Sequence, residues 1–175
     1  MRQLLLAAVV VLAGSTYPVA RADKVEVKGV HLCCGACVKT IGNILKKVDG
    51  VSEVACDRDN QTVRFTTTDS ATAEKAFNNL VKGGFCGKCT TDTGKVFELK
   101  NDAAKTKVNK VTVKDVHVCC NTCRTVIGEL FKGTTITYEG KGTQRDVTIA
   151  GDNLEPAAVL QTLRNAGFTG TIQKQ

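Results

Sequence analysis

Tryptophan is absent from this 175-residue chain, and aromatic residues make up only 5% of it. The 24 Lys and Arg residues are scattered rather than grouped in runs, so the composition gives little support for nucleic-acid binding. The apolar run from Leu4 to Leu12 is too short to span a bilayer, and no later stretch is long or apolar enough to do so. No phosphate-binding loop, nucleophile triad or general acid–base pair is apparent. The sequence therefore predicts a protein that is not an enzyme.

The N-terminus has the layout of a secretory signal peptide. Arg2 precedes the apolar run, and the small-residue triplet Ala20-Arg21-Ala22 follows it. We expect cleavage after Ala22, which removes residues 1–22 and leaves a secreted or periplasmic protein without stable membrane insertion. A retained N-terminal anchor is the alternative.

Cysteine, in contrast, is abundant, with nine residues in the chain. The cassette His-x-Cys-Cys-x-x-Cys occupies residues 31–37 and occurs again at residues 117–123. Further along, Gly84-Phe85 has its counterpart in Gly167-Phe168. Repetition of motifs in the same order predicts two like domains. Because the count is odd, at least one thiol is outside any disulfide within the chain.

Periodicity predicts the elements of the first copy. Alternating residues indicate strands at 24–30, 51–56 and 62–66, of which the last two form a hairpin. Helical spacing predicts a helix over residues 38–48. A second helix is expected to follow Ser70, which can cap it, and to end at Gly83-Gly84 before a final strand. Residues 95–99 are a candidate extra strand.

The second copy repeats this order. Strands are expected at 110–116, 134–138, 146–150 and 168–173, and helices at 122–131 and 156–166, with Pro156 in a first helical turn. Each copy is thus β-α-β-β-α-β. This order predicts an α+β fold of two ferredoxin-like sandwiches, each an antiparallel sheet with two helices on one face. The expected domains are residues 23–99 and 110–175, with the polar residues 100–109 as linker.

A module of this order with Cys-x-x-Cys between its first strand and first helix resembles the heavy-metal-associated domain. That family includes copper chaperones, modules of metal-pumping ATPases and the periplasmic mercury-binding protein. The resemblance implies that Cys34, Cys37, Cys120 and Cys123 bind metal. It also implies that Leu32 and Val118 take the place of a buried Met. The implied partners are the metal ion and a membrane metal transporter or another metal-binding domain.

The position of the cysteines suits a soft metal ion. A helix N-terminus lowers the pKa of a nearby thiol and so favours the thiolate that binds metal. Thiolates prefer soft ions, so the ions expected to bind are Cu(I), Zn(II) and Hg(II) rather than magnesium or calcium. The alternative is a short disulfide in each cassette, because an exported protein meets an oxidising environment.

Each cassette also contains a His and a Cys that the family motif lacks. His31 with Cys33, and His117 with Cys119, are candidates to complete a shell of one histidine and three cysteines. Both histidines precede their Cys by two residues, so on an extended strand end the two side chains point the same way. The alternative is an exposed histidine beside a thiol that replaces the usual Thr.

Three cysteines lie outside the cassettes. Cys86 and Cys89 form a further Cys-x-x-Cys in the first copy only. The fourth strand should begin at the same end of the sheet as the metal loop, so this pair is expected to approach the first one. Together the pairs would form a four-Cys zinc site, and the alternative is two separate disulfides. Cys56 is expected to be a buried, inert thiol.

The function predicted from the sequence is an exported thiol-based heavy-metal-binding protein that sequesters, buffers or transfers a soft ion. One alternative is a redox protein that cycles its Cys-x-x-Cys pairs. The absence of Trp, with Pro156 the only proline after residue 22, speaks against the thioredoxin form of that activity. The other alternative is a binding module held together by disulfides.

Overall fold

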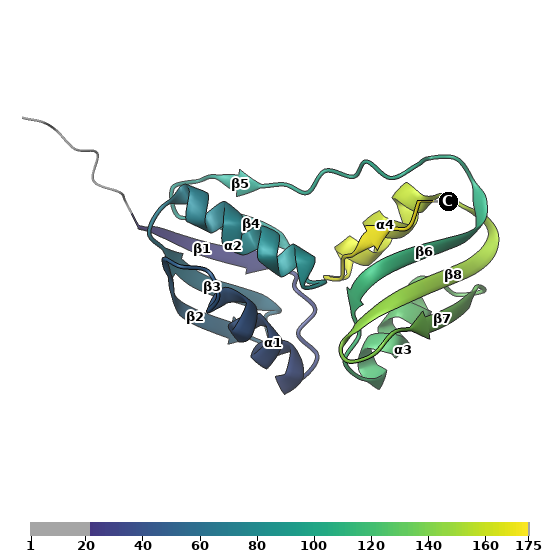
Figure 1. Ribbon diagram of the computed structural model, residues 1–175, viewed down its shortest axis with the longest axis horizontal. Coiled ribbons are helices and arrows are strands. Elements are labelled where there is room, and N and C mark those ends of the chain that lie inside the picture. Colours follow the sequence, from purple (N-terminus) through teal and green to yellow (C-terminus); the bar gives the residue numbers. More distant parts are fainter. Residues whose placement is uncertain (1–21, 175) are drawn as a thin grey trace, which may run out of the picture.

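The computed structural model describes residues 22–174, so the predicted signal peptide lies outside the described residues except for Ala22. Within this range the chain forms two antiparallel sheets, each accompanied by two helices. The two units lie side by side and are connected by an extended segment (Figure 1). The predicted α+β class with two ferredoxin-like units is confirmed.

The first domain has a five-stranded sheet in the order β2-β3-β1-β4-β5. Its elements are β1 (Asp23–Lys28), α1 (Gly35–Leu45), β2 (Val51–Asp57), β3 (Thr62–Thr67), α2 (Ser70–Lys82), β4 (Lys88–Thr91) and β5 (Val96–Phe97). The strand β1 is central and pairs antiparallel with β3 and β4. The first cassette therefore follows directly after the central strand of the sheet. The short edge strand β5 lies within the candidate extra strand.

The second domain has a four-stranded sheet in the order β7-β8-β6-β9. Its elements are β6 (Val108–His117), α3 (Asn121–Leu130), β7 (Thr135–Glu139), β8 (Gln144–Leu154), α4 (Pro156–Asn165) and β9 (Thr171–Ile172). β8 is longer and β9 shorter than predicted. Phe168, predicted within the last strand, instead forms an isolated bridge with Phe85 of the first domain. Contact between the domains thus removes it from its own sheet.

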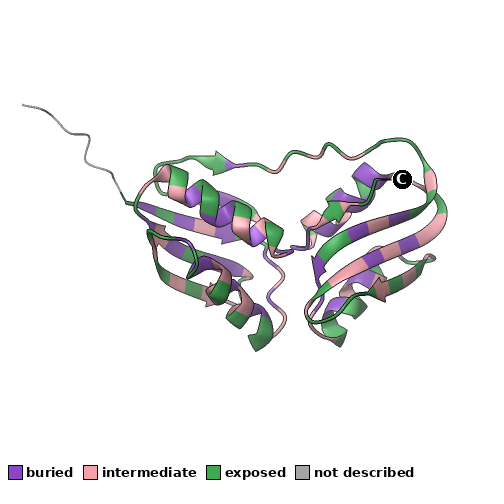
Figure 2. Ribbon diagram, in the orientation of Figure 1, coloured by how far each residue is buried: buried purple, intermediate pink, exposed green. Residues whose placement is uncertain are grey.

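Helices and sheet enclose one apolar core in each domain. Along the strands, buried residues alternate with exposed ones, as Figure 2 shows. Val25 and Val27 of β1 face Ile41 of α1 and Phe77 of α2 in the first core. Leu32 and Val118, at the start of each cassette, are 1% and 3% exposed, so both side chains anchor their cassette in a core.

The N-terminus of α2 differs from the prediction by one residue. Asp69, not Ser70, is the N-cap, and its carboxylate accepts a hydrogen bond of 2.8 Å from the backbone N–H of Thr72. Asp69 has the extended backbone that a cap requires, whereas Ser70 is already the first helical residue. Both residue types can cap a helix, so composition alone did not distinguish them.

The two domains contact each other reciprocally through the repeated Gly-Phe pairs. The ring of His31 in the first domain stacks on Phe168 in the second, with centroids 4.1 Å apart, and His117 lies 4.3 Å from Phe85. The backbone N–H of Thr169 donates to the Gly84 carbonyl at 3.1 Å, and that of Cys86 donates to Gly167 at 3.0 Å. These matched contacts give the domain pair an approximate two-fold symmetry.

Glycine is required at both centres of this contact. Gly84 and Gly167 have φ of +85° and +82°, a conformation that other residues rarely adopt. A Cβ at Gly84 would collide with the backbone N of His117, and a Cβ at Gly167 with that of His31. The close approach of the domains therefore depends on the absence of a side chain at both positions.

Candidate metal centre

The two cassettes occupy equivalent turns between a first strand and a first helix. Cys34 is the N-cap residue of α1 and Cys120 that of α3, with extended backbone at φ −155° and −153°. Neither side chain caps its helix by a hydrogen bond. Cys37 and Cys123 lie inside the first turn and are fully buried. The free N–H groups and the dipole of each helix thus face a pair of sulfurs.

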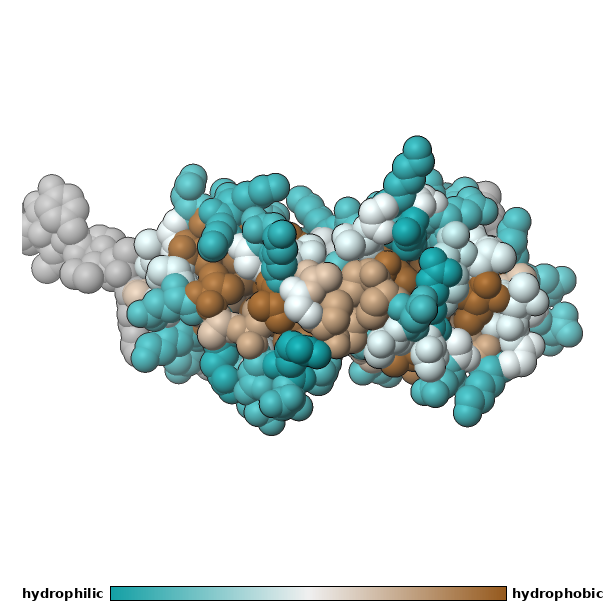
Figure 3. Space-filling view, turned by 90° about the horizontal axis from the view of Figure 1, so that it is seen from below, coloured by the Kyte–Doolittle hydropathy of each residue, from teal (hydrophilic) through white to brown (hydrophobic). Residues whose placement is uncertain are grey.

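The domain contact brings the two cassettes together. The Sγ atom of Cys33 lies 3.4 Å from that of Cys120 and 3.5 Å from that of Cys123. Reciprocally, the Sγ of Cys119 lies 3.5 Å from Cys34 and 3.6 Å from Cys37. The cysteines of both cassettes therefore form one cluster between the domains, where the sequence predicts a site in each copy. Seen from below, an apolar band crosses the same junction (Figure 3).

Two sets of four cysteines within this cluster are close enough to bind a metal ion. The first set is Cys33, Cys34, Cys37 and Cys119, and the second is Cys33, Cys119, Cys120 and Cys123. In each set all four sulfurs lie within 4.8 Å of one another. Each set thus takes three thiols from one domain and one from the other.

The spacing of the sulfurs fits an ion held by four thiolates. A metal–sulfur bond of about 2.3 Å in a tetrahedral shell places neighbouring sulfurs about 3.8 Å apart. The shortest S···S distances of the cluster range from 3.4 to 3.9 Å. An iron–sulfur cluster needs its cysteine sulfurs further apart, because irons and sulfides lie between them. All nine cysteines of the chain are free thiols in the structure.

Cys33, Cys34, Cys119 and Cys120 differ in how readily they ionise. The backbone N–H of Cys37 lowers the pKa of Cys34. Burial opposes ionisation of Cys120, but the Cys123 N–H and the neighbouring thiols outweigh it and lower the pKa of Cys120 to about 6. Burial, followed by hydrogen bonds to neighbouring thiols, raises the pKa of Cys33 and Cys119. The N-cap thiols Cys34 and Cys120 therefore ionise more readily than Cys33 and Cys119, which would have to lose a proton to bind a metal ion.

The two histidines are not part of either four-ligand set among the described residues. His117 is 1% exposed, and burial is the main cause that lowers its pKa to about 4. Burial likewise lowers the pKa of His31. Each ring packs against a phenylalanine of the other domain, His31 stacked on Phe168 and His117 tilted against Phe85. In each set the fourth ligand expected from a histidine comes instead from the central Cys of the other cassette.

The second Cys-x-x-Cys pair also lies outside both sets. Cys89 is buried in the first core, and burial raises its pKa to about 12. Cys86 lines a separate cavity with Gln161 and Arg164 of α4. The predicted approach of this pair to the first cassette is not what the structure shows, because the side chains of Cys86 and Cys89 are taken up by domain packing and the core. Cys56 is half-buried, and burial raises its pKa.

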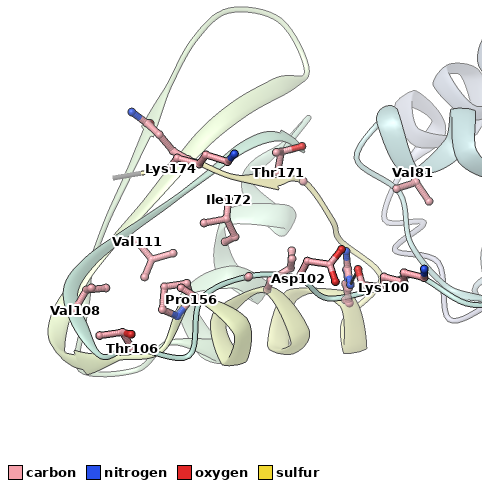
Figure 4. Close-up of a pocket in the computed structure, with 16 residues that line it drawn as sticks. Val81, Lys100, Asp102, Thr106, Val108, Val111, Pro156, Thr171, Ile172 and Lys174 are labelled. Carbon is pink, nitrogen blue, oxygen red and sulfur yellow. Dashed lines mark hydrogen bonds between the residues drawn. The ribbon is translucent and has the colours of Figure 1, made fainter.

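A cavity of about 780 Å³ lies away from the cassettes. It is lined by the segment between the domains, by α4 and by the last strand, and includes Asp102, Val111, Pro156 and Ile172 (Figure 4). None of the predicted site residues lines it. The chemistry of the described residues is therefore concentrated at the sulfur cluster.

A comparison with protein families matches residues 24–88 to the heavy-metal-associated domain. The first domain is a heavy-metal-associated domain. The match runs from β1 to the first residue of β4 and includes the whole first cassette. No curated protein matches the chain. Domains of this family bind heavy metals, and the cysteine cluster can hold a metal ion. No helix among the described residues is both long and apolar enough to cross a membrane.

Two residues of the heavy-metal-associated domain hold its cassette in place by hydrogen bonds, and no sequence pattern pointed to either of them. In the β2–β3 turn, the Gln61 side chain accepts a hydrogen bond of 2.9 Å from the Leu32 N–H. Arg58 donates one of 2.9 Å to the carbonyl of Cys33. In the second domain a backbone carbonyl, that of Thr143, receives the Val118 N–H at 2.7 Å. The sequence identifies the turn as polar but does not indicate which side chains hold the cassette.

Proposed function

We propose that this chain is an exported, non-enzymatic heavy-metal-binding protein that sequesters, buffers or transfers a soft ion such as Cu(I), Hg(II) or Zn(II). The observation that carries the proposal is the cluster of cassette sulfurs, within which two four-cysteine sets have metal-binding spacing. Each domain contributes three thiols, and the second domain repeats the strand–cassette–helix arrangement of the heavy-metal-associated domain. We therefore treat the second domain as a further module of the same kind.

Partial exposure of the N-cap thiols supports a role in metal exchange. Cys34 and Cys120 are half-buried, whereas Cys37 and Cys123 are fully buried. An ion in the cluster could thus be reached from solvent through two thiols whose pKa is lowered. A partner with thiols of its own, in a membrane metal transporter or another metal-binding domain, would exchange ligands at this side.

The test is the metal content of protein purified without oxygen. Wild type and a Cys56→Ser control should contain a bound thiophilic metal. Joint replacement of Cys34 and Cys120 by Ser should weaken binding by at least about 100-fold, because each four-ligand set loses a thiolate. Absence of metal from wild type at any stoichiometry, with all thiols reduced, would overturn the proposal.

Export has its own measurement. The expected mature protein begins at Asp23, the first residue of β1. Intact mass of the protein recovered from the cell envelope or medium of an expressing bacterium should correspond to residues 23–175. Retention of residues 1–22 in a membrane fraction would instead indicate an anchor.

A further inference from the structure

The two four-cysteine sets share two members, Cys33 and Cys119. We propose that the cluster holds two metal ions at once, bridged by the sulfurs of these two residues. The inference rests on the proposed function, since it specifies how the same thiols are divided between ions. Cys34 and Cys37 are then the terminal ligands of one ion, and Cys120 and Cys123 those of the other.

The symmetry of the distances supports a paired site. Exchange of the two domains converts the Cys33–Cys120 contact of 3.4 Å into the Cys119–Cys34 contact of 3.5 Å. It also converts the Cys33–Cys123 contact of 3.5 Å into the Cys119–Cys37 contact of 3.6 Å. The two sets are therefore near copies of each other. If the first set can hold one ion, the second set can hold another of the same kind.

The positions of Cys33 and Cys119 in the cluster are those of bridging ligands. Their sulfurs lie 3.9 Å apart, and each is within 4 Å of sulfurs in both cassettes. Both residues also pack against both apolar cores. These are the cysteines added to the Cys-x-x-Cys of each cassette, so the bridge accounts for residues that a single two-thiolate site would not need.

Charge favours the bridged arrangement as well. Two separate four-thiolate sites would need two more cysteines than the cassettes contain, and they would concentrate more negative charge between the domains. With two shared thiolates, binding of a second divalent ion requires only two further thiolates. Their two negative charges balance the two positive charges of that ion. Divalent ions also compensate thiolate charge better than Cu(I) does. The arrangement therefore suits a divalent ion that accepts four sulfurs, with Zn(II) as the representative.

The experiment is an anaerobic titration of the reduced, chelator-treated protein with Zn(II), followed by mass spectrometry under native conditions. Wild type and Cys56→Ser should each bind two ions. Cys34→Ser should weaken one of them by at least about 100-fold and leave the other, because it removes a terminal ligand from one set. Cys33→Ser, and separately Cys119→Ser, should weaken both ions, because each removes a ligand from both sets.

Each other outcome is decisive. One Zn(II) per wild-type chain, or none, overturns the bridged pair. The proposed function is decided separately, by the metal content of protein purified without oxygen. Two ions with only one weakened by Cys33→Ser would show independent sites and overturn the bridge. X-ray absorption of wild type loaded with two equivalents gives a readout independent of variant folding. Metal–metal scattering is expected, and its absence contradicts the proposal.

Discussion

At the scale of single residues, the cassette cysteines fall into two groups with opposite reactivity. Cys34 and Cys120 lie at helix N-termini and have a lowered pKa, whereas Cys33 and Cys119 lie at the centre of the cluster and have a raised pKa. The same environment thus supplies thiolates that are ready to bind a metal ion and thiols that must lose a proton first.

Alkylation of the metal-free, reduced protein should separate these groups. At pH 7 we expect iodoacetamide to modify Cys120 at least about ten times faster than Cys33, because only the thiolate reacts. Since the pKa of Cys120 is about 6, its rate should level off above neutral pH. The rate at Cys89, with a pKa of about 12, should still rise in strong base. Peptide mass spectrometry over time gives the rates, and equal rates at Cys33 and Cys120 would contradict the assignment.

At the scale of elements, the N-cap of α2 predicts a pH-dependent contribution to stability. Hydrogen bonds from the backbone and side chain of Thr72 lower the pKa of Asp69. The cap should therefore stabilise the fold above the ordinary aspartate pKa of 3.8, and this stabilisation should disappear as the pH falls through the lowered value. Asp69→Ala is expected to lower the denaturation midpoint at pH 7 but to approach wild type in acid. Asp69→Asn, which keeps an acceptor without titrating, is the matched control.

The β2–β3 turn gives a second prediction at this scale. Gln61→Ala removes the acceptor of the part-buried Leu32 N–H and should cost about 1–3 kcal/mol in the free energy of unfolding. It should also weaken metal binding by about 10-fold, because the first cassette loses a support. Gln61→Glu retains the acceptor oxygen and should preserve the affinity. Denaturant titration and a zinc competition assay measure the two effects. Unchanged stability and zinc affinity for Gln61→Ala would mean that the turn does not support the cassette.

The elements themselves were predictable because they depend on local patterns. Apolar alternation places β2 and β3, and the strand-to-helix position of the cassettes follows from the same periodicity. Contacts between distant segments were not predictable in this way. Nothing local in the sequence indicates that Cys89 packs in a core while Cys86 faces Arg164, or that the bridge to Phe85 takes Phe168 out of its strand.

At the scale of the whole molecule, the candidate metal centre lies where the two domains meet. The repeated Gly-Phe pair is visible in the sequence as a landmark of duplication, but its contact with the histidine of the opposite cassette depends on how the domains pack. His117 is buried and His31 half-buried, both against a phenylalanine of the other domain, and a cysteine of the other domain completes each four-cysteine set. The cassettes are thus functionally joined although the sequence shows them 86 residues apart.

Two glycines with the same backbone conformation test whether this contact positions the site. Gly84 has φ +85° and approaches the backbone of His117, whereas Gly94 has φ +86° and a Cβ added to it would meet no atom within 4 Å. Either Gly→Ala change should cost roughly 1 kcal/mol in backbone strain. Only Gly84→Ala should also separate the domains and lower zinc affinity, by about 10-fold or more, because both four-ligand sets span the junction. Equal affinities for the two variants in a competition titration would mean that the sulfur cluster assembles without the Gly84 contact.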